Sequence, residues 1–140
     1  MDNFNRFGDG ILHVGLDVGS TTVKIIVMDD FKNGLYKDYK RHFSDTKNTV
    51  CCVLEDLLAK FPLNSFTLAL TGSGAMSAAK FLGVNFIQEV VSCKRAVERY
   101  IPRTDVVIEL GGEDAKIIYF DESIEQRMNG TCAGRYRCFS

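Results

Sequence analysis

Residues 15–24 read Gly15-Leu16-Asp17-Val18-Gly19-Ser20-Thr21-Thr22-Val23-Lys24 and lie between two apolar runs, Ile11 to Leu16 and Val23 to Met28. An acid enters a bend made of Gly-Ser-Thr-Thr, which predicts a strand, a tight turn and a second strand. Such a turn exposes backbone N–H groups and hydroxyls that suit a phosphate, and the carboxylate of Asp17 could hold Mg²⁺ directly or through water. The alternative is an ordinary β-hairpin, because Gly and Ser are common in turns of any function.

The composition is that of one globular domain with a real core. The chain has 140 residues, of which 46% are hydrophobic and 25% are charged. A net charge of −1 gives no electrostatic reason to expect nucleic acid or an anionic membrane as a partner. Residues 1–10 are polar and are expected to be a disordered or tag-like terminus, without the apolar core of a signal peptide. No apolar run could span a bilayer, so we expect a cytoplasmic protein.

The cysteines do not form a recognisable metal or disulfide pattern. Their number is odd and no CxxC pair occurs, so reduced thiols are expected. Cys132 differs from the others because it lies in the small-residue loop Met128-Asn129-Gly130-Thr131-Cys132-Ala133-Gly134, where a thiolate could face a metal or a partner subunit. A free loop cysteine remains the alternative. The five cysteines are Cys51, Cys52, Cys93, Cys132 and Cys138.

The rest of the first 102 residues predicts a strand meander followed by alternating helices and strands. Ser44-Asp45-Thr46 offers a helix N-cap, and Thr71-Gly72-Ser73-Gly74 is a second glycine turn at the end of a strand. That order predicts an α/β layer with a mixed sheet. The expected elements are a strand at Leu35–Phe43, a helix from Thr46 that ends near Pro62, a strand at Ser65–Leu70, a helix at Ala75–Leu82 closed by Gly83, a strand at Val84–Ile87 and a helix from Val90 to Ile101.

A second meander begins after Pro102. Residues 105–110 are almost continuously apolar and predict a buried strand, Gly111-Gly112-Glu113-Asp114 predicts a turn, and strands are expected at 115–120 and 124–128. The design of the opening hairpin recurs here: an acid, a glycine turn and a lysine appear at Asp17 and Lys24 and again at Glu109 and Lys116. Two such hairpins facing each other would clamp a phosphate, whereas the alternative is two unrelated hairpins.

These motifs resemble a known family. The paired hairpins look like the phosphate loops of the superfamily of actin, sugar kinases and heat-shock ATPases, whose fold has two ribonuclease-H-like halves. More closely, the chain from about Leu12 to Gly134 is similar to the activators of 2-hydroxyacyl-CoA dehydratases and the ATPase subunits of benzoyl-CoA reductases. The motifs that carry this likeness are residues 16–24, Leu70-Thr71-Gly72-Ser73-Gly74, Glu109-Leu110-Gly111-Gly112-Glu113-Asp114-Ala115-Lys116 and Arg127-Met128-Asn129-Gly130-Thr131-Cys132-Ala133-Gly134.

The resemblance implies a fold and a function. Residues 11–102 would form ribonuclease-H-like domain I, and residues 103–134 the first strands of domain II. Two activator subunits would share a [4Fe-4S] cluster, and ATP binding and hydrolysis would drive an electron into a partner enzyme that acts on CoA substrates. The cofactors would be ATP, Mg²⁺ and, in a full-length protein, the cluster.

Particular residues take roles from the same resemblance. Asp17 would hold Mg²⁺ or its water, and Lys24 would support the first loop. Glu109 would sit opposite Asp17, where smaller activators usually carry Asp, and Glu109 or Glu113 could orient the attacking water. Cys132 matches a cluster ligand of the family. The phosphate-binding set would be Gly19, Ser20, Thr21, Thr22, Gly72, Gly111, Gly112 and Lys116.

The end of the chain departs from the family. Family members continue Cys-Ala-Gly-Gly-Thr-Gly-Ala-Phe, whereas this chain reads Cys132-Ala133-Gly134-Arg135-Tyr136-Arg137-Cys138-Phe139-Ser140. Codons for Gly-Thr-Gly-Ala-Phe, read one base out of register, can spell Arg-Tyr-Arg-Cys-Phe. We therefore expect residues 135–140 to be an out-of-frame tail, and sequencing the DNA across Gly134 would test this. The chain would then be an N-terminal fragment with weak or no ATPase activity of its own.

Two other functions also fit the sequence. One is a small-molecule, sugar-type kinase of the same superfamily, although this portion shows no obvious base for a sugar hydroxyl. The other is a non-catalytic nucleotide-binding domain. The orphaned strands after residue 105 are expected to expose an apolar face and to pair with another copy or pack in a non-native way.

Overall fold

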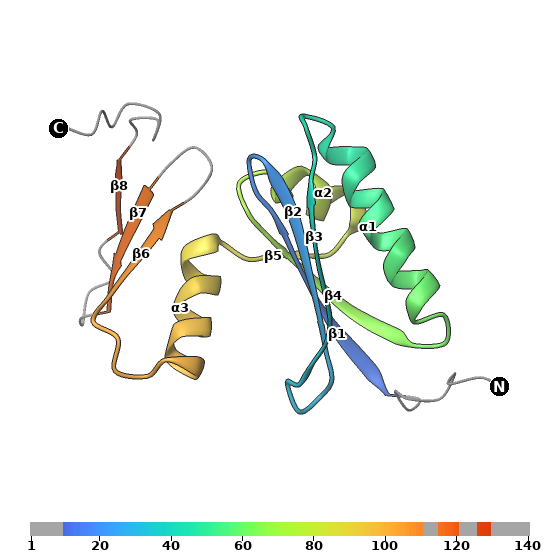
Figure 1. The fold of residues 1–140 in the computed structure, drawn as a ribbon, viewed down its shortest axis with the longest axis horizontal. Coiled ribbons are helices and arrows are strands. Elements are labelled where there is room, and N and C mark those ends of the chain that lie inside the picture. The colour runs from blue at the N-terminus through green and yellow to red at the C-terminus, as the bar shows by residue number, and fades with distance from the viewer. Residues whose placement is uncertain (1–9, 111–114, 121–125, 130–140) are drawn as a thin grey trace, which may run out of the picture. The chain divides into compact units, whose positions relative to one another are not determined.

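The computed structural model describes residues 10–110, 115–120 and 126–129 (Figure 1). The chain divides into two compact units between Ile87 and Gln88, and each unit is described by itself. Of the helices in the described ranges, none is both long enough and apolar enough to cross a membrane.

Unit 1 is a mixed sheet with helices, in the strand order β3-β2-β1-β4-β5. The first three strands form an antiparallel meander, whereas β1 and β4 are parallel, as are β4 and β5. The predicted order of elements is confirmed, with ends that differ by a few residues. The elements are β1 (Ile11–Val18), β2 (Thr22–Met28), β3 (Gly34–Arg41), α1 (Thr46–Lys60), β4 (Ser65–Thr71), α2 (Ala75–Leu82) and β5 (Asn85–Phe86).

The core of unit 1 lies on one face of this sheet. Side chains alternate between faces along a strand, and in β1 every second residue from Leu12 to Val18 is buried. The helix α1 presents Val50, Val53 and Leu57 to the same cluster, and α2 adds Ala75 and Ala79. Burial of a large apolar side chain contributes about 1.5–3 kcal/mol, so this face holds the unit together. Residues of β1 between the buried ones, including Asp17, project from the other face.

The helix ends follow their predicted caps. The Asp45 carboxylate accepts the Asn48 N–H at 3.3 Å at the start of α1, which satisfies a donor that has no partner within the helix. At the end of α2, Gly83 adopts the left-handed conformation with φ of 66°. Both helices therefore begin and end where the sequence indicates.

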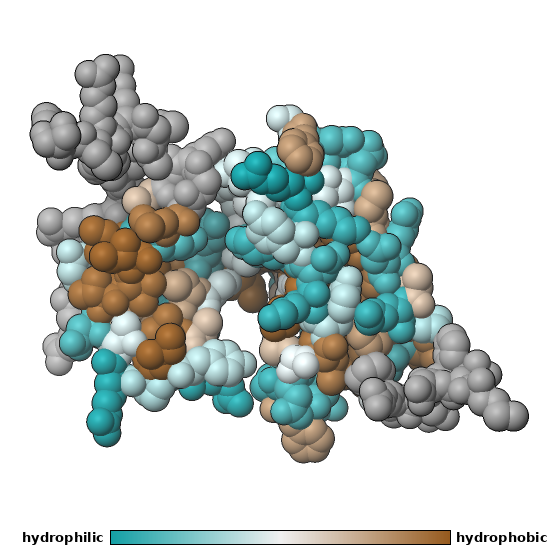
Figure 2. Space-filling model, viewed as in Figure 1, coloured by the Kyte–Doolittle hydropathy of each residue, from teal (hydrophilic) through white to brown (hydrophobic). Residues whose placement is uncertain are grey.

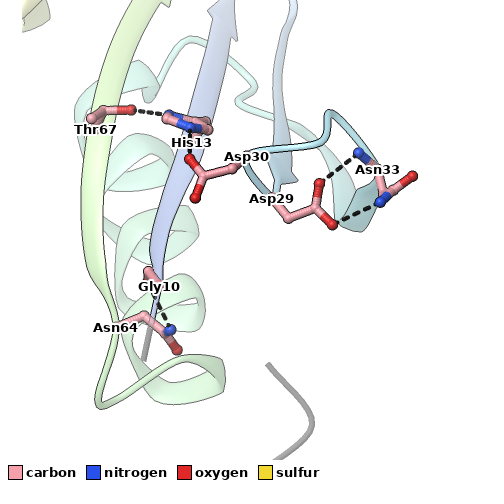
Figure 3. Close-up of polar contacts among 7 residues, drawn as sticks. All are labelled: Gly10, His13, Asp29, Asp30, Asn33, Asn64 and Thr67. Atoms are coloured by element: carbon pink, nitrogen blue, oxygen red, sulfur yellow. Dashed lines mark hydrogen bonds and ion pairs between the residues drawn. The ribbon is translucent and has the colours of Figure 1, made fainter. Parts of the chain in front are cut away.

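Polar contacts fasten the end of the sheet that is remote from the first turn (Figure 3). His13 lies between Thr67 and Asp30, with its Nδ1 at 2.7 Å from the threonine hydroxyl and its Nε2 at 2.9 Å from the carboxylate. In the turn after β2, Asn33 donates to Asp29 from its side chain and its backbone, which lowers the pKa of that carboxyl. These contacts link β1 to β4 and to the turn after β2.

Unit 2 is an antiparallel sheet in the order β6-β7-β8, together with the helix α3. Its elements are α3 (Glu89–Tyr100), β6 (Val106–Leu110), β7 (Ala115–Tyr119) and β8 (Gln126–Asn129). An ion pair between Glu89 and the buried Lys116 fastens α3 to β7. The ion pair places α3 with the second sheet, in the same compact unit. The domain boundary at residue 102 stays a prediction from the sequence.

The prediction of a buried strand at residues 105–110 is wrong for one face of β6. Ile108 is 65% exposed and Leu110 is 81% exposed, and Figure 2 shows apolar surface gathered on this unit. The ion pair at Lys116 places α3 on the face that carries Val107 and Glu109, because these residues pair with Ile118 and Lys116. An apolar run in the sequence predicts a strand that can be buried on both faces, but it does not show that another element packs on each face. The exposure agrees with the expected uncovered apolar face, whereas pairing with another copy stays a prediction.

Candidate phosphate-binding site

The tip of the first hairpin is a tight loop fixed by buried neighbours. The Gly19 N–H donates to the Thr22 carbonyl at 2.9 Å and closes the loop. Val18 and Val23 form the last pair of the hairpin before the loop, and both valines are fully buried. The hydrogen bond and the valine pair hold the backbone of residues 19–22 in one shape at the edge of the sheet.

Asp17 and Lys24 face each other across this hairpin. The register pairs them directly, and Lys24 donates from Nζ to Asp17 Oδ2 at 2.9 Å. The other carboxylate oxygen, Oδ1, is buried and has no hydrogen-bond partner among the described residues. A buried acceptor without a partner costs about 1–3 kcal/mol, so this atom suits a hard cation such as Mg²⁺ or a water bound to one.

The second glycine turn closes on the same point. Gly72 has φ of +104°, and a Cβ placed there would lie 2.3 Å from the Val18 carbonyl oxygen and 2.6 Å from Asp17 Oδ1. Only glycine fits this approach. The Gly74 N–H then donates to the Val18 carbonyl at 2.8 Å, so the start of α2 is fastened to the end of β1. The predicted neighbour of the phosphate loop is thus beside Asp17.

His42, which was not predicted from the sequence, contacts the loop from the opposite flank. Its ring is buried and its Nε2 lies 3.2 Å from the Gly19 carbonyl, while its backbone N–H donates to the Thr21 carbonyl at 3.2 Å. The available signal was its position directly after β3, which pairs with β2 up to the partners Thr22 and Arg41. A residue one step beyond that pair must lie beside the turn.

The second hairpin repeats the register of the first. Glu109 pairs with Lys116, and Leu110 with Ala115, just as Asp17 pairs with Lys24 and Val18 with Val23. The lysine has a different contact, since the ammonium group of Lys116 pairs with Glu89 of α3. Close by, burial raises the pKa of the Cys93 thiol, and the negative charge of Glu109 adds to this effect.

The structure therefore assembles part of the predicted site. Unit 1 brings together the first loop, Asp17, Lys24 and Gly72, whereas Glu109 and Lys116 belong to unit 2. Whether the two hairpins face each other stays a prediction. Gly111, Gly112, Glu113 and Cys132 lie outside the described residues, and within the described ranges no group of His, Cys, Asp and Glu side chains could hold a metal ion by itself.

Comparison with known proteins identifies the family. A family-wide sequence pattern matches the chain from residue 14 to residue 136. The chain belongs to the BadF/BadG/BcrA/BcrD ATPase family. Within this ATPase family, the chain is 31% identical over 129 residues to the (R)-2-hydroxyglutaryl-CoA dehydratase activating ATPase of Acidaminococcus fermentans, a match that covers 88% of this chain and 48% of that protein.

Solved structures agree with this assignment to the ATPase family. The activator of the 2-hydroxyisocaproyl-CoA dehydratase from Clostridium difficile, solved with bound ADPNP, has a TM-score of 0.72 and 27% identity, covering 87% of this chain and 47% of that one. An exopolyphosphatase from Cytophaga hutchinsonii shares only 13% identity but has a TM-score of 0.60 over 89% of this chain and 52% of its own. The predicted actin-like, sugar-kinase-type fold is confirmed. The chain spans about half the length of the curated relatives that it matches.

Proposed function

We propose that this chain supplies the first phosphate-binding half of an ATP-dependent activator of a CoA-substrate dehydratase or reductase. The observation that carries the proposal is the buried, unpartnered Oδ1 of Asp17 beside a glycine loop. Relatives named as a dehydratase-activating ATPase and as an activator with bound ADPNP support the same assignment.

Each described residue of the site takes a defined role in this proposal. Asp17 would bind Mg²⁺ or its water through Oδ1, and Gly19, Ser20, Thr21 and Thr22 would surround the terminal phosphates. The backbone donors would come from the residues after Gly19, because the Gly19 N–H bonds the Thr22 carbonyl. Lys24 donates to Oδ2 of Asp17, which keeps the carboxylate oriented with Oδ1 toward the site. Gly72 allows the second turn to approach without a side chain in the way.

The second hairpin and the cysteine loop would supply the remaining parts of the proposed site. Glu109 or Glu113 would orient the attacking water, and Gly111, Gly112 and Lys116 would line the other side of the phosphates. Cys132 would be a ligand of a [4Fe-4S] cluster, which supplies a low-potential electron when it is present. The proposed partners are a CoA-substrate dehydratase or reductase that accepts the electron and a second activase unit. Location in the cytoplasm stays a prediction from the sequence.

A titration of the isotope-labelled 140-residue chain with Mg²⁺ and ADPNP, followed by NMR, tests the binding role. We expect saturable shifts of the backbone amides of residues 19–22 that require Mg²⁺. Asp17→Asn should weaken this binding about 10-fold or more, because it removes the charge that a hard cation prefers. We expect weak or no steady-state ATP hydrolysis by this chain alone.

Asp30→Asn is the matched control, because Asp30 contacts His13 at the other end of the sheet (Figure 3). It should leave the titration unchanged. Asp17→Asn should alter the free energy of unfolding by less than about 1 kcal/mol, since it removes one half-exposed ion pair. A wild-type chain whose loop amides do not respond to Mg²⁺ and ADPNP would contradict the proposed nucleotide site. In a longer protein, anaerobic iron reconstitution without formation of an oxygen-sensitive cluster would contradict the electron-transfer role.

A further inference from the structure

We propose that His42 is the positioning residue of the phosphate loop, and that its ring sets the direction of the Ser20 N–H group. This inference rests on the proposed nucleotide site, and it adds to that site a residue that makes no contact with the phosphates. The supporting observations are the two bonds from His42 to the loop and the shape of the turn that carries it.

The hydrogen bonds around the ring assign its tautomer. Nδ1 lies 3.1 Å from the Ser44 backbone N–H, so Nδ1 is the acceptor and carries no proton. The proton is therefore on Nε2, which donates to the Gly19 carbonyl at 3.2 Å. The residue is only 6% exposed, so water does not readily replace the ring as the donor to Gly19.

These bonds fix two peptide planes of the loop. In a trans peptide the C=O and the following N–H point in opposite directions. When His42 Nε2 holds the Gly19 carbonyl, the Ser20 N–H must point away from His42. The backbone N–H of His42 donates to the Thr21 carbonyl at 3.2 Å. It therefore fixes the peptide plane between Thr21 and Thr22 in the same way. A single residue thus orients the loop donors that a phosphate would use.

The backbone of the turn after β3 holds the His42 ring against the loop. Phe43 and Ser44 both have positive φ, 44° and 70°, a conformation that residues other than glycine rarely adopt. Phe43 is exposed, so burial of its ring does not account for the strained backbone. Strain of this kind persists where the surroundings enforce it, and it is common next to functional sites. Here the strained residues place the Ser44 N–H on Nδ1 and lead directly to Asp45, the N-cap of α1.

Two substitutions separate the contact with the loop from the contact with the turn. His42→Gln retains an N–H donor at the position of Nε2 and loses the acceptor for Ser44, whereas His42→Asn retains an acceptor at the position of Nδ1 and loses the donor to Gly19. We expect His42→Asn to weaken binding of Mg²⁺ and ADPNP about 10-fold, and His42→Gln to stay within about 3-fold of wild type. Exchange of the Gly19 amide with solvent should accelerate about 10-fold in His42→Asn and about 3-fold or less in His42→Gln.

If His42→Asn bound nucleotide and exchanged the Gly19 amide normally, whereas His42→Gln did not, the proposal would be wrong. The ring would then serve only the turn at residues 42–44. Should the wild-type chain bind no nucleotide, the proposed function fails, but the exchange rate of Gly19 still decides the role of His42. An unchanged Gly19 rate in a folded His42→Asn chain would then refute it. Nitrogen chemical shifts of the wild-type ring give a check that needs no variant, since a proton on Nδ1 would also refute the proposal.

Discussion

The two hairpins β1–β2 and β6–β7 share a register but differ in their surroundings. In both hairpins an acid pairs with a lysine, and one further pair of residues follows before the strands separate. In the first, Lys24 donates to Asp17, and the valines below the turn are buried. In the second, Lys116 pairs with Glu89 of α3, and Leu110 is exposed. The spacing along the chain therefore sets which residues oppose each other, and the packing around the hairpin decides what their charges do.

The largest expected effect comes from removing the support of the first hairpin at Gly72. Gly72→Ala should lower the free energy of unfolding of unit 1 by more than about 3 kcal/mol, because a Cβ would collide with the Val18 carbonyl and the backbone would also be strained. Urea unfolding followed by circular dichroism measures the loss. Gly83→Ala is the control, since Gly83 also has positive φ but a Cβ added there would meet nothing within 4 Å. It should cost only about 1 kcal/mol. Equal losses in the two variants would mean that the contact of the second turn with Val18 and Asp17 is not formed.

A smaller effect distinguishes the two lysines. Lys116→Met should destabilise unit 2 by about 2 kcal/mol, because Lys116 is 8% exposed and its loss leaves Glu89 without that ion-pair partner. Lys24→Met should cost less than about 1 kcal/mol, because Lys24 is 52% exposed. Native-state hydrogen exchange, read separately on α3 and on β2, measures both. If Lys24→Met were the more destabilising variant, the contrast between the hairpins would be reversed.

The smallest effect concerns the thiol beside the second hairpin. Burial and the charge of Glu109 raise the pKa of Cys93, so below that pKa only a small fraction is the reactive thiolate. Glu109→Gln removes the like charge and lowers the pKa, so alkylation of Cys93 by iodoacetamide at pH 8 should become about 2-fold faster. Peptide mass spectrometry gives the rate, with the exposed Cys51 of α1 in the same sample as the reference. A rate that is unchanged or slower would show that Glu109 points away from α3.

The sequence was sufficient for most of unit 1 because its signals are local. Alternating apolar residues, the Asp45 cap and the glycine turn at residues 71–74 each depend on a few neighbours in the chain. The contact of His42 with Gly19 was not predicted because it depends on how far β3 extends beside β2. The ion pair of Lys116 with Glu89 was missed for a similar reason, since it depends on which sheet the helix α3 packs against. Neither contact has a motif of its own.

The parallel pairing of β1 with β4 also orders events during synthesis. His13 and Thr67 contact each other although they are 54 residues apart in sequence, whereas β1, β2 and β3 are consecutive neighbours. When only the meander and α1 have left the ribosome, the residues of the first loop and of its His42 flank are already available to fold. The other flank depends on the hydrogen bond from the Gly74 N–H to the Val18 carbonyl, which cannot form until Gly74 leaves the exit tunnel. During synthesis the first loop therefore lacks its second flank until the glycine turn at residues 71–74 has emerged.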